Sequence, residues 1–151
     1  MEPARNQLTS KPVLREARAD DAAAIAGLLD ELGYPSNAEQ AAERLERIAG
    51  DPATHVVVAE VDGEVAGLAA LHVQNLVESD DLGCELAALV VGERFRRQRI
   101  GERLTQAIEE EARARGGKHL VLNTAHRRGD AHAFYEALGY EHTGRRYAKK
   151  L

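Results

Sequence analysis

One helix between two apolar segments constrains the fold more than any other feature of this sequence. Residues 84–91 form a nearly continuous apolar run, and residues 119–124 centre on Leu-Val-Leu, as expected of strands buried on both faces. The segment between them, about 101–115, repeats apolar residues at helical spacing: Leu104, Ala107, Ile108 and Ala112. Two strands joined by one helix run parallel with a right-handed crossover, so the sequence predicts a parallel strand pair.

Antiparallel strands are predicted on the N-terminal side of this pair. A short strand over 12–17 comes first. The β-branched run 54–60 and the segment 64–73 then flank Asp62-Gly63, which is a strong hairpin signal. We therefore expect these antiparallel strands to form the part of the sheet that comes before the parallel pair in the sequence.

Three more helices are predicted from apolar spacing and capping residues. The first begins after Asp20 or Asp21, and its apolar residues recur at helical spacing: Ile25, Leu28, Leu29 and Leu32. The second runs from about 37 to 49, and the last covers about 130–138. Two short strands are expected to follow Gly139.

Together these elements predict an α/β fold, a single domain with a mixed, mostly antiparallel sheet flanked by helices. The domain is expected to cover residues 12–151. Residues 1–11 are interpreted as a flexible tail, because they lack the apolar core of a signal peptide.

Charge and composition narrow the class of partner. The net charge of −5 and the pI near 5.7 argue against a general nucleic-acid binder, which would show a basic face. No apolar run approaches the roughly 20 residues of a membrane span. Cys84 is the only cysteine, so no intrachain disulfide can form and a cytoplasmic location is expected. A homodimer is left open.

The dense basic cluster at residues 94–99 lies where a buried strand turns into a helix. The first turn of a helix has backbone N–H groups without partners and a partial positive charge. Gly101 lets a ligand approach that backbone closely, so the junction suits a diphosphate. Two alternatives are a solvated arginine-rich helix start and a helix-turn-helix that grips DNA phosphates.

The stretch Arg96-Arg97-Gln98-Arg99-Ile100-Gly101 resembles the pyrophosphate-binding signature of the GNAT superfamily of N-acetyltransferases, Gln/Arg-x-x-Gly-x-Gly/Ala. Arg96 and Gly101 fit this signature, whereas Arg99 stands where its first glycine is usual. This difference from the signature matters only if the turn requires a positive φ at residue 99, because glycine adopts a positive φ more readily than arginine.

The resemblance extends over nearly the whole chain from Pro12. Residues 130–140 look like the late helix of this superfamily, Ala-x-x-Phe-Tyr-x-x-x-Gly-Phe/Tyr, although Arg128 replaces the usual asparagine before it. The opening at residues 15–21 and the hairpin around Asp62-Gly63 are similar to the superfamily as well.

The resemblance implies the acyl-CoA N-acyltransferase fold, in which the two parallel strands splay and acetyl-CoA lies in the gap. It assigns backbone pairing with the pantetheine arm, and an oxyanion contact, to Leu89, Val90 and Val91. It assigns the pyrophosphate to six residues: Arg96, Arg97, Gln98, Arg99, Ile100 and Gly101. Core packing alone is the other interpretation of the strand residues.

Two residues are expected to move protons. The resemblance places Tyr135 where the superfamily donates a proton to the leaving thiolate, and a phenol, with a pKa of about 10, can do so. Glu85 is the first candidate for the general base, because it is the only acidic residue between Cys84 and Val91. His72, Asp130 and a water chain are the alternatives. The histidines and Cys84 show no metal-binding spacing, so no metal is expected.

The implied function is acetyl-CoA-dependent N-acetylation of a primary amine of a small molecule, by direct attack in a ternary complex. An acetyltransferase for peptide N-termini or lysines is the alternative within enzymes, and a non-catalytic acyl-CoA sensor is the alternative outside them. Residues 74–83 are interpreted as a polar loop whose acidic residues could line the acceptor site: Glu78, Asp80 and Asp81.

Overall fold

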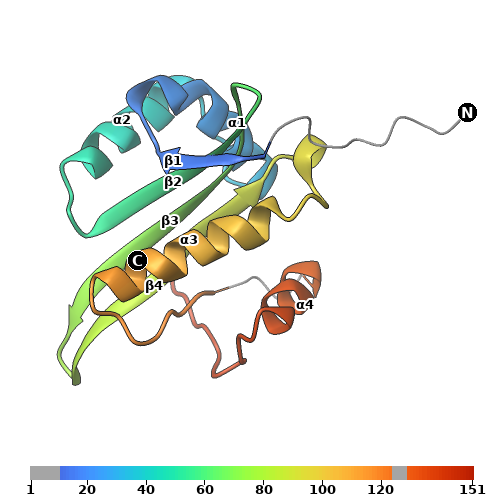
Figure 1. Ribbon diagram of the computed structural model, residues 1–151. Helices are drawn as coiled ribbons and strands as arrows, with labels where there is room; N and C mark the ends of the chain where they lie inside the picture. The colour runs from blue at the N-terminus through green and yellow to red at the C-terminus, as the bar shows by residue number, and fades with distance from the viewer. Residues whose placement is uncertain (1–10, 124–128) are drawn as a thin grey trace, which may run out of the picture. The chain divides into compact units, whose positions relative to one another are not determined.

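The computed structural model describes residues 11–123 and 129–151, which divide between two units, Met1–Val121 and Leu122–Leu151. The first unit contains the sheet and most of the helices, and the second contains one helix (Figure 1). The predicted tail falls almost wholly on residues outside the described ranges, so the domain boundary at residue 12 stays a prediction.

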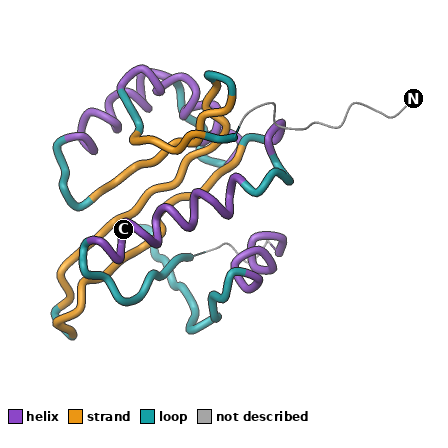
Figure 2. The backbone as a smooth tube through the Cα atoms, in the orientation of Figure 1, coloured by secondary structure: helices purple, strands orange, loops and turns teal. Residues whose placement is uncertain are grey.

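Four antiparallel strands form the sheet of the first unit in the order β1 (Val13–Glu16), β2 (Thr54–Val61), β3 (Glu64–Leu76) and β4 (Ser79–Val91) (Figure 2). The hairpin between β2 and β3 turns at Asp62 and Gly63, as predicted. Their φ values of 50° and 80° are both positive, which a type I′ turn requires.

The polar loop predicted over 74–83 is wrong, because most of it is strand. β3 and β4 continue as a hairpin to the pair Leu76↔Ser79. Backbone pairing needs no apolar side chains, so a ladder can extend beyond the core as an arm with polar residues on both faces. Only Val77 and Glu78 are left to make the turn.

Helices cover both faces of the sheet (Figure 1). On one face, here the α1/α2 face, α1 (Ala22–Leu32) and α2 (Ala38–Ala49) pack on the sheet. Their core joins two helices and three strands and includes Ile25, Leu28, Ala41, Val58, Leu68 and Val90. Asn37 caps α2, since its Oδ1 accepts a hydrogen bond of 2.8 Å from the Gln40 N–H.

On the opposite face, here the α3 face, α3 (Ile100–Ala114) packs on β2, β3 and β4. It buries Ile100, Leu104, Ile108 and Ala112, three of which the apolar spacing identifies. Gly67 of β3 makes this close packing possible. A Cβ atom there would lie 3.1 Å from Leu104 Cδ1 and 2.8 Å from the Val90 carbonyl oxygen.

The chain returns to the sheet after α3 in the predicted parallel direction. Val121 forms a parallel bridge with Glu85, in which the Leu86 N–H donates to Val121 O at 2.8 Å and the Val121 N–H donates to Cys84 O at 2.9 Å. The strand predicted over 119–124 is reduced to this one bridge in the described residues. The mixed, mostly antiparallel sheet flanked by helices is confirmed.

The second unit contains α4 (Gly129–Ala137), within one residue of the predicted helix. The two strands predicted after Gly139 are not found, because the described residues 140–151 form neither helix nor strand. A strand exists only through hydrogen bonds to a neighbour, and the described part of this unit offers none.

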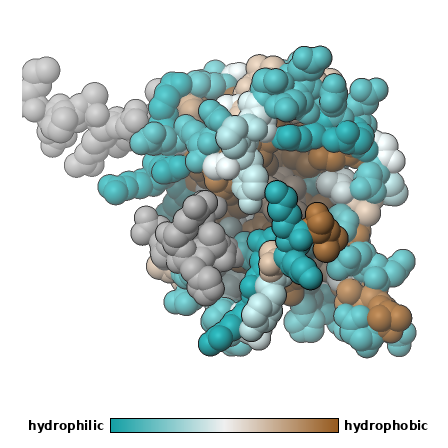
Figure 3. Space-filling model, turned by 180° about the vertical axis from the view of Figure 1, so that it is seen from behind, coloured by the Kyte–Doolittle hydropathy of each residue, from teal (hydrophilic) through white to brown (hydrophobic). Residues whose placement is uncertain are grey.

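Hydrophilic residues predominate on the face drawn in Figure 3. In the described residues, every helix is too short or too polar to cross a lipid bilayer.

Candidate functional site

The outer edge of β4 is the first component of the candidate site. β4 is the last strand of the sheet, and the described residues of the first unit continue it only at the bridge between Glu85 and Val121. Beyond that bridge, no described residue of this unit pairs with the outer edge of residues 87–91. Extended backbone of another molecule could pair there.

The hydrogen bonds of β4 indicate which of its backbone groups face this edge. The Gly92 N–H donates to Ala66 O at 2.8 Å, so the Gly92 amide points inward to β3. Backbone groups alternate in direction along a strand. Leu89 and Val91 therefore present their N–H and C=O groups to the outer edge, while those of Val90 point to β3.

A β-bulge at Ala87 determines the face on which Glu85 lies. Ala88 pairs with Ala70 and Leu86 pairs with Leu71, so Ala87 is an extra residue in β4. Regular alternation would place Glu85 on the same face as Leu89. With the bulge, Glu85 shares the α1/α2 face with Ala88 and Val90, and Leu89 lies on the α3 face with Val91.

Glu85 lies at the end of a polar row that crosses three strands. Its register partner in β3 is His72, and the partner of His72 in β2 is Thr54. All three residues are partly buried. Residues opposite one another in antiparallel strands have Cβ atoms about 4.5–5.5 Å apart, so neighbouring side chains in this row lie within reach.

Asp51 extends the row beyond β2 to the surface. Its Oδ1 accepts a hydrogen bond of 2.9 Å from the Ala53 N–H, and its Oδ2 accepts one of 2.9 Å from Thr54 Oγ1. These bonds, with a smaller electrostatic contribution from His72, lower the pKa of the Asp51 carboxyl. Sequence reasoning missed Asp51 and Thr54, because Gly50-Asp51-Pro52 indicates only a break in the chain.

The basic turn is the second component of the candidate site. After a short 3-10 helix, η2 (Glu93–Phe95), Arg97 and Arg99 have φ values of 65° and 62°. Arg99 is therefore left-handed at the position where the resembling signature has glycine. This conformation costs a non-glycine residue about 1–2 kcal/mol.

The turn leaves anion-binding groups free. Arg99 occupies the N-cap of α3 without a side-chain capping bond, so the first N–H groups of α3 have no cap there. A left-handed residue followed by a helical one turns successive N–H groups toward one side, a geometry that binds anions. The turn also holds a buried oxygen, Gln98 Oε1, that has no hydrogen-bond partner within residues 11–123 and 129–151.

The arginines of the turn divide into two pairs. Arg94 binds Glu64 at 2.7 Å and lies over the ring of Phe95, and Arg96 Nε donates to Val91 O at 3.3 Å. Arg97 and Arg99 are exposed, and neither guanidinium group has a hydrogen bond or ion pair with another described residue. Two guanidinium groups and a helix N-terminus thus fit the diphosphate predicted at residues 96–101.

Tyr135 lies on α4 in the second unit. Its ring packs edge-on against Phe134, with centroids 5.1 Å apart, and against Tyr140 at 5.8 Å. It is partly buried. Arg128 lies outside the described residues, as does the side chain of Asp130. The acid role of Tyr135 stays a prediction.

The described residues, 11–123 and 129–151, contain no group of three His, Cys, Asp or Glu side chains that could hold a metal ion. Cys84 of β4 is buried, and burial raises the pKa of its thiol.

Comparison with known proteins identifies relatives of this chain. The acetyltransferase (GNAT) family matches residues 22–140. The chain is 35% identical over 144 residues to an aminoalkylphosphonate N-acetyltransferase of Salmonella typhimurium, a match that covers 91% of this chain and 90% of the relative.

Solved structures share the fold at lower identity. A transcriptional regulator from Bacillus halodurans superposes with a TM-score of 0.86 at 21% identity, over 93% of this chain and 99% of that one. An aminoglycoside N-acetyltransferase in complex with CoA superposes with a TM-score of 0.81 at 18% identity, over 93% and 94% of the two chains.

Proposed function

Because this chain belongs to the GNAT acetyltransferase family and is an N-acetyltransferase, we propose that it acetylates the primary amine of a small molecule by direct attack in a ternary complex with acetyl-CoA. One observation carries this proposal: the outer edge of β4 has open backbone groups and leads directly into a basic turn and the N-terminus of α3. Acetyl-CoA has an extended pantetheine arm that ends in a diphosphate. The arm needs an open strand edge, and the diphosphate needs an anion-binding turn next to it.

Each end of the cofactor has a proposed site. The backbone groups of Leu89 and Val91 pair with the pantetheine arm, which lies along the edge of the sheet as an added strand. The N–H groups at the start of α3, together with Arg97 and Arg99, bind the pyrophosphate. Arg96 releases Val91 O when the arm enters, since that carbonyl faces the same edge.

Two side chains move the protons. Glu85 removes a proton from the acceptor ammonium, which leaves a neutral amine able to attack. Tyr135 donates a proton to the sulfur as the C–S bond breaks. The position of Glu85 supports its role, because it lies on β4 next to the edge proposed for the cofactor arm.

The acceptor class to test first is the short aminoalkylphosphonates. The relative whose name contains this substrate is 35% identical and aligns with nearly the whole chain. Acceptor contacts usually come from loops, which vary between relatives, so peptides with a free N-terminus or a lysine belong in the same test.

The test measures CoA release with acetyl-CoA and a panel of aminoalkylphosphonates, simple alkylamines and peptides. We expect turnover with at least one small amine, at a higher kcat/KM than with any peptide. Peptides as the best acceptors would contradict the small-molecule proposal. If acetyl-CoA raised the melting temperature but no amine released CoA, the chain would act as a sensor.

A further inference from the structure

We propose that His72 carries the proton of the acceptor from Glu85 to solvent, with Asp51 stabilising the protonated imidazole. This inference rests on the proposed function, with Glu85 as the base. It adds a proton-relay residue and a direction for the proton, outward across the sheet from β4 to β2.

The reaction needs such an exit because the acceptor loses two protons and CoA takes up only one of them. An ammonium acceptor has three N–H bonds, and the amide product of a primary amine keeps one. One of the two departing protons ends on the sulfur of CoA. The other must reach solvent in every turnover, and Glu85 must lose it before the next acceptor can be deprotonated.

The register of the sheet provides the path. Glu85, His72 and Thr54 are consecutive cross-strand partners, and the bulge at Ala87 places Glu85 on the α1/α2 face, where His72 and Thr54 also lie. Neighbouring strands are about 4.8 Å apart. The His72 imidazole on β3 therefore lies between Glu85 on β4 and Thr54 on β2, one strand from each. Its two nitrogens allow it to accept a proton on one side and release one on the other.

Exposure increases along the same path. Glu85, His72 and Thr54 are partly buried, whereas Asp51 is exposed and lines an open surface hollow with Arg44 and Arg47 of α2. The lowered pKa of the Asp51 carboxyl keeps it charged. Asp51 therefore attracts the imidazolium without holding the proton, which passes to water.

The charges near His72 favour this direction. Glu85 from β4 and Asp51 from the turn before β2 are the carboxylates next to it in the row, and Thr54 of β2 is neutral. Arg44 and Arg47 line the open hollow together with Asp51. His119 lies on the segment that leads to Val121, across β4 from His72.

The experiment compares wild type, His72→Gln and His55→Gln with an amine that the wild type acetylates, between pH 6 and pH 9, with and without added imidazole. His55 is the matched control: it lies next to Thr54 in β2 but faces the α3 face, where it contacts Glu16. We expect His72→Gln to lower kcat at least about tenfold at pH 6–7 and much less at pH 9. Added imidazole should restore much of the loss, because an external base then takes the proton.

Three outcomes would overturn the relay. One is an unchanged kcat for His72→Gln. Another is a loss that is uniform across pH and insensitive to imidazole, which indicates a structural role. The third is a further large loss when His72→Gln is added to Glu85→Gln, because residues that act in series are not additive. Failure of the wild type to acetylate any amine would instead overturn the proposed function, and the relay with it.

Discussion

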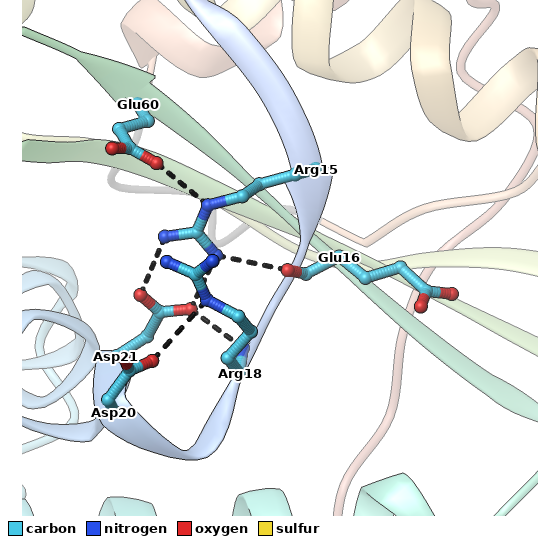
Figure 4. Close-up of polar contacts among 6 residues, drawn as sticks. All are labelled: Arg15, Glu16, Arg18, Asp20, Asp21 and Glu60. Atoms are coloured by element: carbon cyan, nitrogen blue, oxygen red, sulfur yellow. Dashed lines mark hydrogen bonds and ion pairs between the residues drawn. The ribbon is translucent and has the colours of Figure 1, made fainter. Parts of the chain in front are cut away.

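Arg15 and Asp21 form a two-bond ion pair, with 2.9 Å between Nη1 and Oδ2 and 2.9 Å between Nη2 and Oδ1 (Figure 4). Arg15 Nε also donates to Glu60 Oε2 at 2.7 Å, and the Arg18 N–H donates to Asp21 at 2.7 Å. Asp21 is 5% exposed. The cluster joins β1 to β2 and to the start of α1, and the bonds from Arg15 are the main reason that the pKa of Asp21 is lowered.

Replacing Asp21 by Asn should lower the free energy of unfolding at pH 7 by about 1.5–3 kcal/mol, because charge-assisted hydrogen bonds are lost in a buried place. Since the pKa of Asp21 is lower in the folded state, its contribution is present above the ordinary pKa of about 3.9 and disappears as pH falls through the folded value. Urea unfolding at pH 7 and pH 3 tests this. Asp20→Asn, with Asp20 exposed and 3.4 Å from Arg18, is the control and should cost less than about 1 kcal/mol.

Replacing Arg99 by Gly should raise stability by about 0.5–1 kcal/mol. The left-handed conformation costs an arginine about 1–2 kcal/mol, and glycine adopts it freely at a smaller entropic cost. Arg99→Ala retains the strain and should give no gain. Both variants lose the guanidinium, so both should show a smaller increase in melting temperature with acetyl-CoA. Equal stability of the Gly and Ala variants would argue against strain at this position.

The sequence was sufficient to predict the strand–helix–strand unit around α3, because a strand buried on both faces is a continuous apolar run and an amphipathic helix repeats its apolar residues at helical spacing. It could not predict the face of Glu85. Residues 84–91 are apolar on both faces, so no alternation of polar side chains marks the extra residue at Ala87. Likewise, nothing local indicates a positive φ at Arg99, since arginine disfavours it. Only the packing of η2 and α3 against the sheet can impose that conformation.

Gly101→Glu should abolish the increase in melting temperature that acetyl-CoA produces. A ligand at a hundredfold excess over its Kd stabilises by about 2.7 kcal/mol, and a carboxylate in the first turn of α3 would repel the phosphates. Gln106→Glu is the matched control, because it adds the same charge at an exposed position farther along α3. A Gly101→Glu variant that responds like wild type would exclude the phosphate site from this turn.

Tyr135→Phe should lower kcat by about 10²–10⁴-fold while leaving the affinity for acetyl-CoA nearly unchanged, because only the proton donor is lost. Tyr140→Phe removes a hydroxyl from the ring that packs edge-on against Tyr135 and serves as the control. Steady-state kinetics and thermal shift distinguish the two effects. If both variants retained wild-type kcat, with the chemical step rate-limiting, Tyr135 would be a packing residue.

Glu85→Gln tests the general base by its dependence on pH. Glutamine keeps the shape of the side chain but cannot accept a proton at neutral pH. A lysine-like amine has a pKa of about 10.4, so at pH 6–7 almost all acceptor is charged and needs a base. The loss in kcat/KM should therefore be greatest at low pH, about 10²-fold or more, and should shrink toward pH 9–10.

A matched variant and the shape of the pH profile decide how this result is interpreted. Glu78→Gln removes a carboxylate from the exposed turn of the β3–β4 hairpin and should leave the profile unchanged. A loss for Glu85→Gln that is equal at every pH would mean that Glu85 positions the acceptor, since a missing base matters less as more amine becomes neutral. No loss at any pH would leave deprotonation to water.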